Sequence, residues 1–172
     1  FRPRRTEEEI RKQMPWATQG KLAGHKRNVI TSLELDPAIM EENNIRFQAK
    51  YRKIEEAEVR YEEIGCENAD YLMIAFGSMA RICLKTQEMA LAEGIKVGVL
   101  RPITLWPFPS KIIAEYSNKV KGMISVELNA GQMVEDIRLA VNGKVKVEHF
   151  GRLGGIVPTP DEVLNALKQK LM

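Results

Sequence analysis

From residue 66 onward, apolar runs alternate with segments that have helical spacing. The run at 71–76 (YLMIAF) is typical of a strand buried on both faces. Further strands are predicted at 96–101, 122–128 and 144–150, with amphipathic helices after each strand. Strands that alternate with helices of about 10 to 15 residues predict an α/β fold: a mostly parallel sheet with helices on both faces, in three Rossmann-like layers.

Residues that favour helix termini stand at the expected ends of these helices. They are Ser78, Ser110 and Thr159 as N-caps, with a capping box over Thr159–Glu162, and Gly94 and Asn142-Gly143 as C-terminal stops.

The first 65 residues follow a different pattern. They hold 25 of the chain's 49 charged side chains, and the opening segment is too polar to build a core. Asp36-Pro37 predicts the start of a helix over 37–61, which we expect to pack by one apolar stripe, and 28–35 reads as a short strand. We therefore expect a charged helical arm that serves as connector, residues 1–65, before the α/β domain, residues 66–172. The stripe consists of Met40, Phe47, Tyr51, Ile54 and Tyr61.

Composition narrows the functional classes. The net charge of +3 balances 26 basic against 23 acidic residues, which gives no strong attraction to nucleic acid or to anionic lipid. No stretch reaches the roughly 20 apolar residues of a membrane span. The two cysteines, Cys66 and Cys83, form no C-x-x-C pair, so we expect inert thiols in a cytoplasmic chain. Because the chain begins with Phe1, we expect it to be part of a longer polypeptide.

The unusual residues of the α/β part gather in four loops, each directly after a predicted strand: 77–81, 101–109, 129–132 and 151–160. In a parallel sheet these loops share the carboxyl edge, where such folds carry function. The candidate interface or substrate-rim residues are Ser78, Arg101, Trp106, Phe108, Asn129, Gln132 and Arg152.

Each loop also has a purely structural interpretation. The segment 77–81 (GSMAR) has one glycine where a dinucleotide fingerprint has three, so nucleotide binding is disfavoured. The loop 101–109 (RPITLWPFP) is either a turn packed by its own aromatics or a rigid docking ridge. Arg152 lies in a glycine-rich turn that can also form an anion nest. Glu127 is expected to pair with Arg101 or Arg152, with a catalytic role left open, and His149 to be packed or capping. We assign no catalytic residue and no metal site.

The four loops together resemble a known family. Gly77-Ser78, GIKVGVLRPITLWPFP, VELNAGQMVEDIRLAV, GRLGG and PTPDEVL occur in the order and spacing of the C-terminal region of the alpha (large) chain of 2-oxoacid:ferredoxin oxidoreductases. PWATQGK and NVITSLELDPAIMEENNIRFQAKY resemble the connector before that region, most like the 2-ketoisovalerate (branched-chain) members.

The resemblance implies a transketolase C-terminal-like domain in an enzyme that oxidatively decarboxylates 2-oxoacids to acyl-CoA with ferredoxin as electron acceptor. It implies thiamine diphosphate, magnesium and iron–sulfur clusters in the whole complex but no cofactor in this fragment, which is expected to be inactive alone. The implied partners are an upstream thiamine-pyrimidine domain, beta and gamma subunits, and a ferredoxin-like subunit. Two alternatives stay open: a stand-alone Rossmann-like domain that binds a nucleotide or coenzyme A, and a pure protein-interaction module.

Overall fold

The computed structural model describes residues 5–14, 24, 29 and 31–172. The chain forms two units, residues 1–45 and 46–172. In the first unit, helix α1 (Glu7–Gln13) is opened by a capping box between Thr6 and Glu9. The strand predicted over 28–35 is wrong, because its described residues, 29 and 31–35, form none. The PWATQGK segment, residues 15–21, lies outside the described residues.

Helix α2 (Pro37–Ala57) begins as predicted, since the Asp36 carboxylate accepts hydrogen bonds from the N–H groups at the helix start, 2.8 Å from Ala38 N. The helix ends at Ala57 instead of 61, and Tyr61 belongs to the sheet. No residue of α2 is buried, so its apolar stripe joins neither core, but Tyr51 of the stripe packs edge-on against Trp106. Charged side chains around the helix leave only a narrow apolar face.

The second unit is built on a five-stranded sheet in the order β1-β3-β2-β4-β5. The four strands β2 to β5 are parallel, and β1 joins β3 at the edge in antiparallel register, with Tyr61 opposite Pro102. The mostly parallel sheet is therefore confirmed, and its first strand lies within the segment that the sequence assigned to the arm. The strands are β1 (Tyr61–Ile64), β2 (Tyr71–Ile74), β3 (Val97–Pro102), β4 (Gly122–Glu127) and β5 (Lys146–Gly151).

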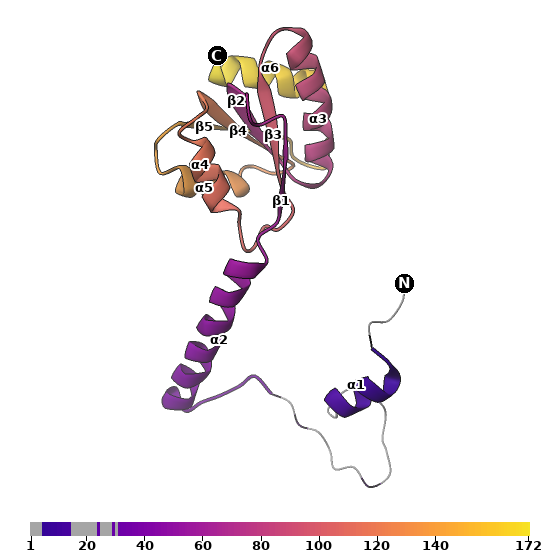
Figure 1. Cartoon of the computed structure of the whole chain (residues 1–172), viewed down its shortest axis with the longest axis vertical. Helices are drawn as coiled ribbons and strands as arrows, with labels where there is room; N and C mark the ends of the chain where they lie inside the picture. The colour runs from indigo at the N-terminus through magenta and orange to yellow at the C-terminus, as the bar shows by residue number, and fades with distance from the viewer. Residues whose placement is uncertain (1–4, 15–23, 25–28, 30) are drawn as a thin grey trace. The chain divides into compact units, whose positions relative to one another are not determined.

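Four helices cover the sheet in the three-layer arrangement that the sequence predicts. Helices α3 and α6 pack together on one face, and α4 and α5 pack together on the other (Figure 1). Alternate residues of each strand serve the two cores: Met73 and Ile124 lie in the first, Leu72 and Met123 in the second. The helices are α3 (Gly77–Ala92), α4 (Ser110–Tyr116), α5 (Met133–Val141) and α6 (Pro160–Leu171).

The predicted helix caps are correct at three positions and wrong at two. Thr159 and Glu162 form the capping box of α6, Gly94 follows α3 with a φ of +78°, and Asn142 ends α5 in the left-handed region. Ser78 and Ser110 are not N-caps, because each lies inside the first turn of its helix. With these serines as N-caps the helices would begin at 79 and 111, but α3 begins two positions earlier, after Phe76, and α4 one position earlier, after Pro109.

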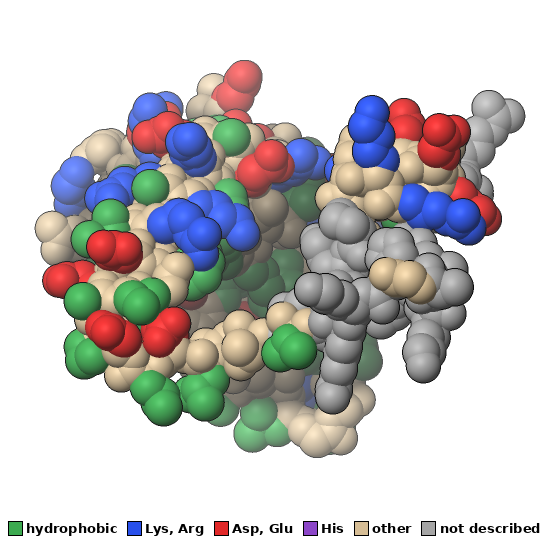
Figure 2. All heavy atoms as spheres, turned by 90° about the horizontal axis from the view of Figure 1, so that it is seen from below, with side chains coloured by type: hydrophobic (Ala, Val, Ile, Leu, Met, Phe, Trp, Pro, Cys, Tyr) green, Lys and Arg blue, Asp and Glu red, His purple; other side chains and the backbone are tan. Residues whose placement is uncertain are grey.

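Both cysteines are buried and free. Burial raises the pKa of the Cys66 thiol to about 11 and that of Cys83 to about 12, so both stay protonated at neutral pH and are poor nucleophiles. No helix among the described residues is long and apolar enough to cross a membrane. On the face drawn in Figure 2, Lys and Arg side chains are mixed with Asp and Glu, in keeping with the small net charge.

The first prediction concerns Gly98, the second residue of β3. A Cβ at this position would lie 2.8 Å from both the Cys66 Cα and a Leu72 methyl carbon. Because backbone blocks the site, we expect Gly98→Ala to lower the free energy of unfolding by about 1–3 kcal/mol. Gly122→Ala is the matched control, because its Cβ would meet the end of the Leu171 side chain, which can move. Urea denaturation measures both variants, and equal losses would contradict the close approach at Gly98.

Candidate functional site

The four candidate loops follow β2, β3, β4 and β5 and share one edge of the sheet, since these strands are parallel. The loop after β2 enters α3 on one face, and the loop after β4 enters α5 on the other. Such a divergence of connections is where open α/β sheets bind ligands. Ser78 stands in the first loop, exposed in the opening turn of α3, and Asn129 and Gln132 stand in the second.

The loop 101–109 is part packed and part exposed. Pro102, Pro107 and Pro109 are buried, and Phe108 packs against the core between the sheet and helices α4 and α5. Trp106 is 56% exposed, and its ring contacts Tyr51 of α2 edge-on at 5.6 Å between centroids. The packed-turn interpretation therefore holds for the prolines and Phe108, and docking through Trp106 stays a prediction.

The two candidate arginines are each held in an ion pair, and Glu127 is the partner of neither. Arg101 pairs with Glu62 of β1 at 2.8 Å, and Arg152 pairs with Glu162 of α6 at 2.7 Å. The expected salt bridge from Glu127 is therefore wrong. Strands β2 and β4 lie between β3 and β5, which separates the two arginine backbones by about 14 Å at the usual strand spacing.

Glu127 is instead the buried centre of the loop after β4. Its side chain is fully enclosed, and its residue is 1% exposed. One carboxylate oxygen accepts from the Ser125 hydroxyl at 2.7 Å and from the Val134 N–H at 3.0 Å. The other accepts from the Asn129 amide at 3.1 Å and from the N–H groups of Gln132 and Met133 at 3.2 and 2.9 Å. The carboxylate thus caps α5 and fixes the loop that carries two candidate residues.

The ionised form of Glu127 is the one that this environment favours. Burial alone would raise the pKa of its carboxyl group, but the hydrogen bonds from Ser125, Met133, Asn129 and Gln132 together hold that pKa below its usual value. A carboxylate that accepts several N–H bonds is a positioning group rather than a proton donor at neutral pH.

His149 lies beside this carboxylate on β5. Its Nε2 is 3.9 Å from a Glu127 oxygen and is a buried nitrogen without a hydrogen-bond partner among the described residues. Burial lowers the pKa of His149, with contributions from Lys170 and Arg138, although the Glu127 charge opposes the shift. The imidazole is therefore neutral at pH 7, and its packed position agrees with the sequence expectation.

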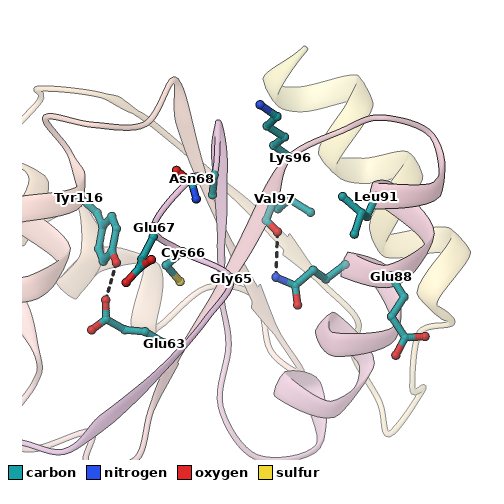
Figure 3. Close-up of a pocket in the computed structure, with 12 residues that line it drawn as sticks. Glu63, Gly65, Cys66, Glu67, Asn68, Glu88, Leu91, Lys96, Val97 and Tyr116 are labelled. Atoms are coloured by element: carbon teal, nitrogen blue, oxygen red, sulfur yellow. Dashed lines mark hydrogen bonds between the residues drawn. The ribbon is translucent and has the colours of Figure 1, made fainter.

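A pocket of about 640 Å³ opens at the opposite, amino edge of the sheet (Figure 3). Several of its polar groups have partners within the chain. Tyr116 donates to Glu63, Gln87 donates to the carbonyl oxygens of Ile64 and Val97, and the Cys66 thiol donates to Val99 O at 3.3 Å. The side chains of Glu67, Asn68 and Lys96 also line the pocket. Among the described residues, no cluster of His, Cys, Asp and Glu side chains could hold a metal ion.

Sequence reasoning placed the edge and its candidate residues but missed the role of Glu127. The available signal was the absence of a Ser, Thr or Asp cap directly before α5, whose N-cap is Gln132 and has no side-chain cap. A carboxylate five positions earlier, at the end of the preceding strand, supplies the missing acceptor. Rules for helix caps consider only the residues next to the first turn, so they do not detect a cap five positions earlier.

The second prediction concerns the pH dependence of stability. A folded pKa below the unfolded value means that Glu127 stabilises the fold fully above about pH 4.3, and that this stabilisation is lost as the pH falls through the folded pKa. We expect Glu127→Gln to lower the free energy of unfolding by about 1.5–3 kcal/mol at pH 7. The difference in unfolding free energy between the parent and the variant should become smaller below about pH 4.3.

Denaturant unfolding at pH 7, 5 and 3.5 measures this gap. Glu135→Gln is the matched control, because Glu135 is an exposed acid in the first turn of the same helix. A gap for Glu127→Gln that stays constant across the pH range would show that its charge does not stabilise the loop.

Residues 69–163 match the model of the pyruvate:ferredoxin oxidoreductase core domain II family. The chain is 44% identical to ketoisovalerate oxidoreductase subunit VorB of Methanothermobacter thermautotrophicus, over 94% of this chain and 45% of that protein. It is 33% identical to 2-oxoglutarate synthase subunit KorA of Methanothermobacter marburgensis, over 59% of this chain and 27% of that protein. The chain thus spans less than half the length of these relatives.

Two solved structures share the fold. One is 2-oxoglutarate:ferredoxin oxidoreductase from Magnetococcus marinus, solved with 2-oxoglutarate, coenzyme A and succinyl-CoA bound, with a TM-score of 0.66 and 23% identity over 81% of this chain and 24% of that chain. The other is a split-gene transketolase, an inactive beta4 tetramer, with a TM-score of 0.56 and 19% identity over 65% of this chain and 41% of that chain. At these identities the likeness shows the fold alone, and it confirms the predicted α/β class. The family match and the 44% identity along nearly the whole chain establish more: this chain belongs to the pyruvate:ferredoxin oxidoreductase core domain II family.

Proposed function

We propose that this chain is the C-terminal region of the alpha subunit of a 2-oxoacid:ferredoxin oxidoreductase that acts on 2-ketoisovalerate. The whole enzyme would convert the 2-oxoacid and coenzyme A to acyl-CoA and carbon dioxide and pass two electrons to ferredoxin. The observation that carries the proposal is the gradient of similarity. Identity to the ketoisovalerate subunits is 44% and 42% over 94% of the chain, against 33% over 59% for a 2-oxoglutarate synthase subunit.

The similarity to the ketoisovalerate subunits also reaches into residues 1–65. An alignment over 161 residues must include part of this segment, since the α/β part from 66 to 172 holds only 107 residues. The similarity therefore covers part of the proposed connector arm as well as the domain, and strand β1 of the arm segment completes the sheet.

In the proposed complex, other parts supply the cofactors. Thiamine diphosphate, magnesium and iron–sulfur clusters would be held by the partner subunits, in a cytoplasmic assembly that also includes the upstream part of this chain. Its relatives are named as subunits, and the chain covers 45% of the length of the ketoisovalerate subunit. We therefore propose that the chain contributes to assembly and to the shape of the active site, and that it has no turnover by itself.

The carboxyl edge is the surface proposed to meet those other parts. Its loops expose a series of large apolar side chains, and contiguous apolar surface on a soluble domain often marks an interaction site. Three of these side chains belong to the loop 101–109, whose buried prolines and half-buried Phe108 fix the backbone before any contact. A pre-ordered loop loses little conformational entropy on docking. The exposed side chains are Ile103, Leu105, Trp106, Leu128, Leu153, Ile156 and Val157.

The third prediction tests the reaction. We expect the purified full-length complex to reduce ferredoxin in the presence of coenzyme A with a higher kcat/KM for 2-ketoisovalerate than for 2-oxoglutarate. A site fitted to a branched apolar side chain leaves the second carboxylate of 2-oxoglutarate unpaired, which disfavours that substrate. Pyruvate serves as the small control substrate. Preference for 2-oxoglutarate would overturn the substrate assignment, and absence of any 2-oxoacid-dependent reduction would overturn the function.

The fourth prediction tests the edge. In the complete complex, Trp106→Ala and Arg101→Ala should weaken assembly or lower 2-oxoacid-dependent ferredoxin reduction. For Trp106, the loss of a buried anchor corresponds to about 2 kcal/mol or more, or roughly 30-fold in affinity. The Arg101–Glu62 pair is exposed and contributes little stability, so a strong effect of Arg101→Ala would report a contact with another part of the enzyme.

Leu139→Ala is the control for this experiment, because Leu139 is a highly exposed apolar residue in the last turn of α5, away from the carboxyl edge. Concentration-dependent gel filtration and steady-state rates provide the two readouts. If the Trp106 and Arg101 variants assemble and turn over like Leu139→Ala, this half of the edge is only a well-packed turn.

A further inference from the structure

We infer that Glu127 is a positioning residue of the proposed enzyme: it holds the loops after β4 and β5 in the one arrangement in which their side chains meet the rest of the complex. This inference rests on the proposed function, because loop geometry affects turnover only if the edge docks. It assigns the carboxylate no contact with substrate or cofactor.

The side chain of Glu127 fixes the loop after β4 at both of its ends. The Asn129 amide anchors the start of the loop, and the N–H groups of Gln132, Met133 and Val134 anchor its end. Asn129 also accepts from the N–H of Gly131 at 2.7 Å, which closes the turn between the two anchors. The exposed side chains of Leu128 and Gln132 therefore project from a backbone that is held on either side.

The main chain of Glu127 reaches the next loop. Its carbonyl oxygen accepts from the N–H of Arg152 at 3.3 Å. Gly151 passes so close to the Asn129 carbonyl oxygen that a Cβ would overlap it, and the His149 ring lies on the same side. The start of the loop 151–160, at Gly151 and Arg152, is thus held against the loop 129–132. Trp106, which follows β3, lies on the far side of β2.

Besides its contribution to stability, the Glu127 carboxylate restricts the arrangement of the loop. Helix α5 is already placed on the core through Met133, Val134, Ile137 and Val141, all buried. Removing an ionised group from water is costly, and this cost is offset only where several donors reach the carboxylate together. A carboxylate with five donors around two oxygens admits one arrangement, since any rotation of the loop leaves a donor or an acceptor without a partner.

The fifth prediction uses Glu127→Gln in the assembled complex. The glutamine keeps the shape but turns an NH₂ group toward donors that need an acceptor. We expect kcat/KM for the 2-oxoacid, per assembled complex, to fall at least about tenfold, because misplacement of groups by about 1 Å far from the chemistry can cost about 100-fold. Hydrogen exchange at the amides of residues 131–134 and 152 should accelerate, while exchange in α3 and α6 stays as in the parent.

The matched control is Ser125→Ala. It removes one donor to the same carboxylate but leaves all the loop contacts in place, so kcat/KM should change less than about twofold. If Glu127→Gln does not accumulate, Glu127→Asp replaces it. Aspartate keeps the charge but is one methylene shorter, so it should show the same changes with smaller amplitude.

Two outcomes would overturn the inference. The first is a lower melting temperature with unchanged kcat/KM per assembled complex, which would make Glu127 a stabilising residue only. The second is unchanged exchange at residues 131–134. Failure of the proposed function looks different, because the parent complex would then lack 2-oxoacid-dependent ferredoxin reduction while the exchange measurement would still decide whether Glu127 orders the two loops.

Discussion

Coverage of both faces of the sheet is the constraint on which the molecule depends. A parallel sheet needs crossover helices, and these helices bury both faces. In this chain, α3 with α6 and α4 with α5 bury the central strands β2, β3 and β4, which leaves the two ends of these strands as the surfaces available for function. At the amino edge, Gln87, Tyr116 and Glu63 of the pocket are hydrogen-bonded within the chain. The carboxyl edge, by contrast, exposes apolar side chains and charged groups on four loops, so functional contact is expected there.

Much of this arrangement follows from local sequence patterns. The strand–helix alternation predicts the three layers, and the capping box at Thr159 and the left-handed stop at Asn142 are correct because each depends on residues adjacent in the chain. Strand β1 was missed because Tyr61 continues the helical stripe of α2, and only pairing with β3 makes the segment a strand. Whether Tyr61 continues the helix or begins a strand is thus decided by its pairing with Pro102, 41 residues away in the sequence.

The location of the candidate site was predictable from the sequence, but the ion pairs and hydrogen bonds among its side chains were not. Topology alone brings the four loops to one edge, so the seven candidate residues could be named from the sequence. Which charged side chains form ion pairs depends on which of them lie within contact distance in the folded chain. Arg101 meets Glu62 because an antiparallel edge strand was added beside it, and Arg152 meets Glu162 because α6 begins next to its loop. Both arginines pair with other glutamates, and the Glu127 carboxylate accepts hydrogen bonds from backbone N–H groups of α5. These hydrogen bonds favour the ionised carboxylate without a neighbouring cation.

The width of the carboxyl edge indicates what kind of contact it suits. The two candidate arginines belong to strands about 14 Å apart and are each neutralised by a glutamate, so they do not form a clamp for one small carboxylate. The apolar side chains are spread in the same way, from Trp106 after β3 to Val157 after β5. Two separately ordered halves, one fixed by buried prolines and the other by Glu127, present a broad and pre-formed surface. Such a surface matches a protein partner better than a metabolite, because protein interfaces draw on several anchors distributed over a wide area whereas small ligands need a few polar groups converging on one point.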